Sequence, residues 1–133
     1  MTTVFSRIIE GELPCAKVYE DDLVFAFMDA GQVNPGHVLV VTKALYETLM
    51  DADEDSAAAM MRAATRIAKA VQRAFRPDGI TILQANRPAG WQTVPHLHLH
   101  VLPRYENDGV ELGWPRKEPG MEKLREYAAK IIV

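Results

Sequence analysis

Three of the four histidines in this 133-residue chain fall within five positions, at His96, His98 and His100. Aliphatic residues fill the positions between them. Strict alternation of polar and apolar residues predicts a β-strand, because successive side chains in a strand point to opposite faces. We therefore expect a strand over residues 96–102, with three imidazoles on one face and aliphatic side chains packed into a core on the other.

Such a histidine face has three interpretations. It can be a half-buried strand whose polar side is histidine by chance, although histidine is not favoured in strands. It can hold a metal ion, since neutral imidazole is a common ligand for zinc, copper or nickel. It can also carry out nucleophilic and acid–base chemistry on a phosphoryl or acyl group, with one imidazole attacking while its neighbours handle protons and charge.

The residues before the histidines favour the third interpretation. Residues 86–95 form a loop punctuated by Gly and Pro, which brings the amide of Gln92 and the hydroxyl of Thr93 to the start of the strand. Together with backbone N–H groups, these side chains can donate hydrogen bonds to anionic oxygens. A metal site would more often recruit Asp, Glu or Cys nearby, and none lies between Asn86 and Arg104.

The pattern of residues 96–102, His-φ-His-φ-His-φ-φ with φ apolar, resembles the motif of the histidine triad (HIT) family. The flanking residues 92–94 and 103–104 match what family members carry at these positions. The resemblance runs from about Val4 to Arg104, and it includes residues 19–22, 25–29 and the Pro35-Gly36-His37 segment with the apolar residues that follow it.

The resemblance implies that His98 is a nucleophile that attacks the α-phosphorus of a purine nucleotide and forms a covalent nucleotidyl-histidine. Water would then release the nucleoside monophosphate. The attacking ring nitrogen must be unprotonated, and in the family the other nitrogen is hydrogen-bonded to a main-chain carbonyl, here that of His96. His100 and Thr93 would hydrogen-bond the phosphoryl oxygens, and His37 would be a fourth active-site histidine that fixes a tautomer.

The nucleotide-binding residues are also implied by the resemblance. The carboxylate of Asp29 would accept hydrogen bonds from the ribose diol, although a carboxylate at this position can also simply cap the loop. Gln92 and the loop amides would hold a phosphate oxygen. The base would occupy an apolar slot, with core packing as the alternative role for its candidate residues, which are Val4, Phe5, Ile8 and Phe27.

The chain departs from the family beside the leaving group. Relatives often carry Asn at the position of Ala85, where it contacts the phosphate or leaving group, whereas here Asn86 is next to it, and they carry Gly at the position of Trp91. Asn86 and Trp91 are therefore further candidate nucleotide-binding residues. Leaving-group preference is therefore open. We expect a nucleotide phosphoramidase or hydrolase, with a dinucleoside polyphosphate hydrolase or phosphorylase, or a non-catalytic nucleotide sensor, as alternatives.

No metal or other cofactor is expected. Many bacterial relatives hold a structural zinc with two cysteines and a histidine, and the corresponding positions here are Thr3, Ser6 and Leu45.

Hydrophobic periodicity and turn residues locate the remaining elements. Five strands with one long and two shorter helices indicate an α+β domain with an antiparallel sheet. The family pairs two such domains across a two-fold axis into a continuous sheet, so a homodimer is expected. The expected helices are 4–9, a long helix between about 51 and 76, and 122–132; the expected strands are 16–20, 23–29, 37–41, 80–84 and 96–102.

Length and composition suit one domain, with a core over about residues 4–104 and a tail over residues 105–133 that carries a helix. The net charge of −3, without a basic stripe, argues against a nucleic-acid partner. The single cysteine, Cys15, cannot form an intramolecular disulfide, which fits a reducing compartment. With no apolar run that could cross a membrane, we expect a cytoplasmic protein without a membrane partner.

Overall fold

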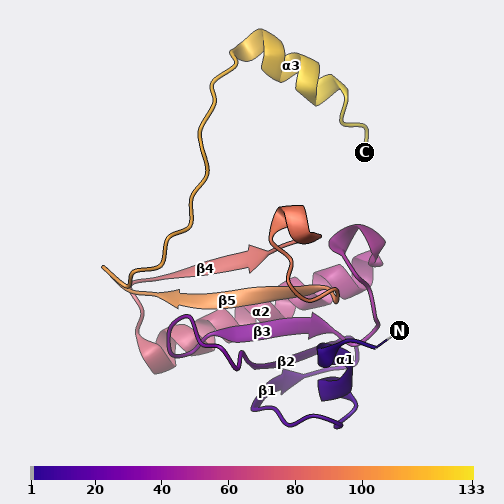
Figure 1. Ribbon diagram of the computed structural model, residues 1–133, viewed down its shortest axis with the longest axis vertical. Helices are drawn as coiled ribbons and strands as arrows, with labels where there is room; N and C mark the ends of the chain where they lie inside the picture. The colour runs from indigo at the N-terminus through magenta and orange to yellow at the C-terminus, as the bar shows by residue number, and fades with distance from the viewer. Residues whose placement is uncertain (1) are drawn as a thin grey trace.

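The computed structural model describes residues 2–133, which form a five-stranded antiparallel sheet flanked by helices (Figure 1). The strand order is β1-β2-β3-β5-β4, so β1 and β4 are the two edges. The predicted α+β class, with one long and two shorter helices, is confirmed. The helices are α1 (Val4–Ile9), α2 (Glu54–Phe75) and α3 (Met121–Ala129). The strands are β1 (Lys17–Glu20), β2 (Val24–Met28), β3 (Val38–Thr42), β4 (Gly79–Gln84) and β5 (His98–Arg104). Two short 3₁₀ helices that were not predicted are η1 (Leu49–Asp51) and η2 (Pro88–Gly90).

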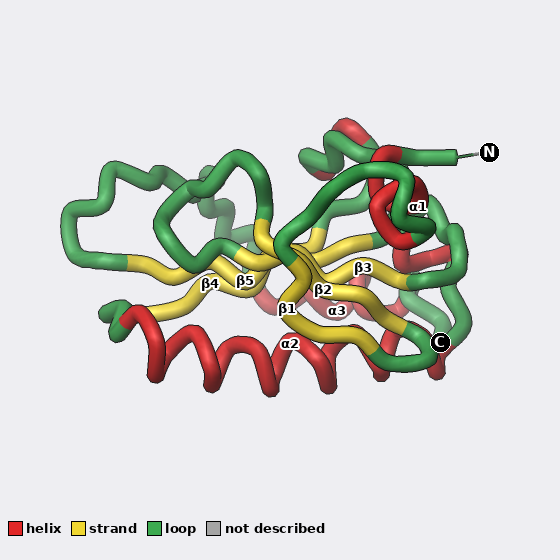
Figure 2. Tube along the Cα trace, turned by 90° about the horizontal axis from the view of Figure 1, so that it is seen from below, coloured by secondary structure: helices red, strands yellow, loops and turns green. Residues whose placement is uncertain are grey.

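The long helix α2 covers one face of the sheet (Figure 2). Its start is capped by Asp53, whose carboxylate accepts a hydrogen bond from the backbone of Ser56 at 2.9 Å. Apolar residues three and four apart give it a buried stripe. That stripe packs against every second residue of the three central strands, and the contact includes Ala59, Met60, Ala63, Ala64, Ile67 and Val71 from the helix and Val24, Ala26, Val38, Val40, Leu97, Leu99 and Val101 from the sheet.

The opposite face of the sheet carries the histidines. Here Phe25 and Phe27 of β2 and two aliphatic residues of β3 pack against Phe5 of α1. Alternation along β5 places His98 and His100 on this side, away from α2. The sheet therefore separates an aliphatic core from a layer that combines aromatic and imidazole rings.

The prediction that the triad strand begins at His96 is wrong by two residues. The backbone bends before β5, because the His96 N–H donates to the carbonyl of Val94 at 2.8 Å and the Leu97 N–H to that of Tyr46 at 2.7 Å. Ladder pairing to β3 then starts at His98, which lies opposite Val41. The predicted alternation nevertheless holds, since Leu97 packs against α2 while the His96 ring lies on the other side, against Phe5.

The turn into β3 depends on Gly36. Its φ of +102° lies in the left-handed region that glycine adopts readily. A Cβ atom at this position would also meet the ring of Phe75 at 2.8 Å. Glycine therefore lets the chain pass close to the end of α2 and enter β3 at His37.

Beyond β5 the chain leaves the core. Residues 111–133 are all exposed, and α3 stands apart from the sheet at the end of an extended segment (Figure 1). Among residues 2–133, no helix has the length and apolar character needed to cross a membrane.

Candidate active site

The ring of His98 is held from behind by its own strand. Its Nδ1 lies 2.6 Å from the carbonyl oxygen of His96. A carbonyl only accepts hydrogen bonds, so Nδ1 must carry the proton and Nε2 must present a lone pair. Phe5 packs edge-on against the ring with centroids 4.9 Å apart. His98 is thus fixed in one orientation and one tautomer, with an unprotonated nitrogen.

His96 is fully buried and plays a supporting part in this arrangement. Its Nε2 donates to the carbonyl of Thr42 at 2.7 Å, so its Nδ1 is the acceptor. The hydroxyl of Thr3 donates to that nitrogen at 2.9 Å. Both ring nitrogens are therefore occupied within the protein, and His96 acts on His98 through its main-chain carbonyl.

Thr3 is a site residue that the sequence analysis did not identify. It caps α1, where its hydroxyl oxygen accepts from the Ser6 N–H at 3.1 Å and the Ser6 hydroxyl accepts from the Thr3 N–H at 2.7 Å. The Thr-x-x-Ser spacing resembles a capping box and could have located the cap. The contact with His96 spans 93 residues and has no local signal in the sequence.

His37 and His100 form a hydrogen-bonded pair with defined proton positions. The Val33 N–H donates to Nδ1 of His37 at 3.2 Å, so the proton of His37 is on Nε2. This Nε2 lies 2.9 Å from Nδ1 of His100 and 3.4 Å from Oδ2 of Asp29. His100 accepts at Nδ1, which leaves its own proton on Nε2. The Nε2–H of His100 is therefore a hydrogen-bond donor next to His98. The ring centroids of His98 and His100 are 5.2 Å apart.

Burial keeps all four histidines neutral. Desolvation lowers the pKa of His98, an effect partly offset by its hydrogen bond to His96 and by the charge of Asp29. Burial likewise lowers the pKa values of His37 and His96. Burial, with His98 and His37 nearby, lowers the pKa of His100 to about 4. At pH 7 the site therefore offers a neutral nucleophile and neutral donors.

The loop between β2 and β3 holds Asp29 and His37 together. Asp29 accepts from the Gly31 N–H at 2.9 Å with Oδ1, which is the loop-capping role that the sequence left open. The amide of Gln32 donates to the carbonyls of Asp29 and His37 at 2.6 and 2.8 Å. Gln32 was also missed, since a polar residue in a loop carries no specific pattern.

The predicted phosphate loop uses its amides internally. The side-chain oxygen of Gln92 accepts from the Arg87 N–H at 2.6 Å, and its nitrogen donates to the carbonyl of Glu47 at 2.7 Å. Asn86 accepts from the Leu49 N–H at 2.8 Å and exchanges hydrogen bonds with Gln84. These two residues therefore shape the loop, which limits what they can offer to a phosphate.

Two non-glycine residues of the same loop have left-handed backbones. Arg87 has φ +65° and Trp91 has φ +78°. Such conformations are costly away from glycine and cluster at functional sites. The side chains of Trp91 and Thr93 are exposed at this rim.

The four candidate residues for the base slot divide into two groups. Phe5 and Phe27 are buried and contact each other edge-on at 5.6 Å between centroids. Ile8 is half-buried beside them, whereas Val4 is largely exposed. The two aromatic residues therefore support the histidine layer, and the surface of α1 offers Val4 and Ile8 to a ligand.

Asp29, His37 and His100 are also the types of residue that bind metals. Their possible ligand atoms lie within 4.8 Å of one another. In the tautomers above, the His37 Nε2 carries a proton and points at the His100 Nδ1. The hydrogen-bond chain thus accounts for the cluster without an ion.

Comparisons with known proteins agree with this fold. The model of the HIT domain matches residues 10–107. The chain is 39% identical over 112 residues to the Bacillus subtilis protein named "Protein hit", covering 84% of this chain and 77% of that one. It is 38% identical over 101 residues to the "Purine nucleoside phosphoramidase" of Escherichia coli, covering 75% and 85%. The chain therefore belongs to the HIT domain family.

A solved structure supports the same assignment over the full length. The crystal structure of a HIT family member from Bacillus subtilis superposes with a TM-score of 0.90 at 34% identity. The match covers 100% of this chain and 99% of that one, so it includes the tail as well as the sheet.

Proposed function

We propose that this protein is a nucleotide phosphoramidase or related hydrolase that acts on the α-phosphate of purine nucleotides through a nucleotidyl-His98 intermediate. The observation that carries the proposal is the 2.6 Å hydrogen bond from Nδ1 of His98 to the carbonyl of His96. That bond leaves Nε2 unprotonated and directed away from the strand. The name of the Escherichia coli relative supports a phosphoramidate as the substrate.

In the first step, the Nε2 lone pair of His98 forms a bond to the α-phosphorus as the bond to the leaving group breaks. The leaving group departs with its electron pair and takes up a proton from solvent, which the attacking water of the second step returns. The Nε2–H of His100 donates to a phosphoryl oxygen as negative charge develops, and Thr93 at the loop rim assists it. The His37–His100 hydrogen bond keeps this donor in place.

In the second step, water attacks the same phosphorus and the imidazole leaves. Imidazole suits such a double displacement because its unperturbed pKa lies near neutrality, so it is both a nucleophile and a leaving group. The products are a nucleoside monophosphate and regenerated His98. No metal ion is needed in this scheme.

For the nucleotide, we propose that the ribose diol binds at Asp29 and that the base lies against Val4 and Ile8, with Phe5 and Phe27 beneath them. Trp91 limits the room for the leaving group.

We also propose a homodimer in which the two β4 edges pair across a two-fold axis. This edge strand has no partner within residues 2–133, and an unpaired edge is a template for such pairing.

The proposal is tested by measuring nucleotide release from an adenosine phosphoramidate and from a dinucleoside polyphosphate. His98→Ala should reduce kcat/KM by at least about 10³-fold while nucleotide binding persists, because the covalent step is lost. The wild type should prefer the phosphoramidate. If the wild type binds nucleotide without turnover, the protein is a sensor and the proposal is wrong.

A further inference from the structure

The helix α3 presents apolar side chains to solvent. Met121, Leu124 and Tyr127 are between 47% and 60% exposed, and the three-residue steps between them place them along one side of the helix. A nine-residue helix is too short to persist in water without a contact that buries such a side. An apolar surface of this kind indicates an interaction.

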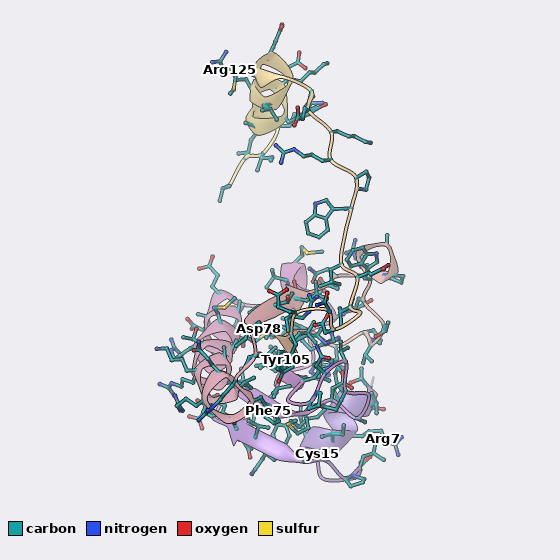
Figure 3. All side chains as sticks on the ribbon, turned by 90° about the vertical axis from the view of Figure 1, so that its left-hand side faces the viewer. Arg7, Cys15, Phe75, Asp78, Tyr105 and Arg125 are labelled. Atoms are coloured by element: carbon teal, nitrogen blue, oxygen red, sulfur yellow. The ribbon has the colours of Figure 1, made fainter. Side chains whose placement is uncertain are left out.

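The core of the same protomer does not supply that contact. The stretch 111–120 runs away from the sheet, and Figure 3 shows the helix bearing Arg125 well separated from the core that carries Phe75 and Asp78. All side chains from residue 111 onward are exposed. We refer to residues 111–133 as the arm.

The base of the arm is firmly anchored, so the direction in which it leaves is defined. Asp108 accepts from Nε of Arg104 at 2.8 Å and from the side chain of Asn34 at 3.0 Å. The Tyr105 hydroxyl donates to the carbonyl of Phe75 at 3.2 Å, and the Glu106 N–H donates to Asp78 at 2.8 Å. From this base the arm passes the outer edge of β4, and α3 lies beyond that edge (Figure 1).

A matching apolar hollow lies on the far side of the molecule. It has a volume of about 200 Å³ and lies between the C-terminal half of α2 and strands β1 to β3. Val18 and Phe75 at its rim are 43% and 41% exposed. Its lining residues include Val18, Met28, Val38, Ile67, Val71 and Phe75.

We propose that α3 of one protomer packs into this hollow on a second copy of the chain. The inference rests on the β4-paired homodimer proposed above. A two-fold axis normal to the sheet places the partner beyond β4, which is where α3 lies. The guanidinium of Arg66 beside the hollow, 3.2 Å from the Tyr19 hydroxyl, provides a cation for Glu122 or Glu126 of the incoming helix.

The connecting chain is long enough for this exchange. From β5 of one protomer to β1 of the other is six strand spacings, or about 29 Å. The ten residues 111–120, which follow the anchored base, can extend over about 33 Å. The Bacillus subtilis crystal structure, which matches this chain over its whole length, shows that an arm with a similar course occurs in a solved relative.

Cysteine cross-linking of the full chain tests the proposal. In a Cys15→Ser background, Leu124→Cys is combined with Ala70→Cys, which lies in the hollow. The matched control combines Leu124→Cys with Ala58→Cys, another exposed alanine near the other end of α2. Mild oxidation should yield a disulfide-linked dimer at least about tenfold faster with Ala70→Cys, because docking raises the effective thiol concentration to the mM range.

The possible outcomes separate this proposal from the dimer on which it rests. An internal disulfide within a monomer, or equal rates for the two pairs, would show that the arm does not dock in the partner's hollow. Light scattering of the reduced protein reports the dimer independently. A dimer without preferential cross-linking overturns only the arm exchange, and a monomer overturns both.

Discussion

At the residue scale, four backbone and side-chain contacts decide which nitrogens of the histidines carry protons. The carbonyls of His96 and Thr42 can only accept, and the N–H of Val33 can only donate, so three tautomers follow directly. The fourth, that of His100, follows from His37. The site is thus set up before any ligand arrives, as electrostatic preorganisation requires.

Thr3→Val should destabilise the protein by about 1–3 kcal/mol, because it removes both the cap of α1 and the donor to the buried His96. Thr3→Ser keeps the hydroxyl and should stay within about 1 kcal/mol of the wild type. Urea unfolding measures both variants. A Thr3→Val protein as stable as the wild type would mean that the Thr3–His96 contact contributes nothing.

At the element scale, the helix α2 ends in a strained conformation. Arg76 is the C-cap, with φ and ψ both +50° in the left-handed region. This region costs a non-glycine L-residue about 1–2 kcal/mol, and glycine is the residue usually found at such helix ends.

Arg76→Gly should therefore stabilise the protein by about 0.5–1 kcal/mol, after allowing for the greater freedom of glycine in the unfolded chain. The matched control, Arg73→Gly, lies in the regular last turn of the same helix and should destabilise by about 1 kcal/mol. Thermal unfolding of the two variants compares them. Destabilisation by both would contradict the assignment of strain to Arg76.

Elements could be predicted from the sequence where the signal is local. Hydrophobic periodicity and turn residues located α2, and the alternation in residues 97–101 assigned each side chain to the correct face of the sheet. The bend at His96 could not be predicted, because it depends on a bond to Tyr46. The same holds for Gln92, whose partner Glu47 is 45 residues away. Long-range bonds of this kind leave no periodic pattern.

At the scale of the whole molecule, the buried histidines make stability depend on pH. Their native pKa values lie below the ordinary value of 6.5, so between pH 6.5 and about 4 the unfolded chain binds protons that the native state excludes. Stability should therefore be full above pH 6.5 and should decline as the pH falls toward 4. Chemical unfolding across this range measures the slope.

The matched control for that slope is His100→Asn, since it removes the histidine with the lowest pKa. Its stability should decline less between pH 6.5 and 4 than that of the wild type. An identical slope in the two proteins would indicate that carboxylates, and not the buried imidazoles, dominate the acid response.

At the same scale, the proposed reaction passes through a single nitrogen, Nε2 of His98. Mass spectrometry of single turnovers with an adenosine phosphoramidate, quenched in alkali, tests this most directly, because the acid-labile nucleotidyl-histidine bond survives and shows where the nucleotide is attached. We expect a transient adenylyl group on the peptide that contains residues 96–100, located on His98 and missing from His98→Ala. An adduct on another histidine, or full turnover without any adduct, would contradict it.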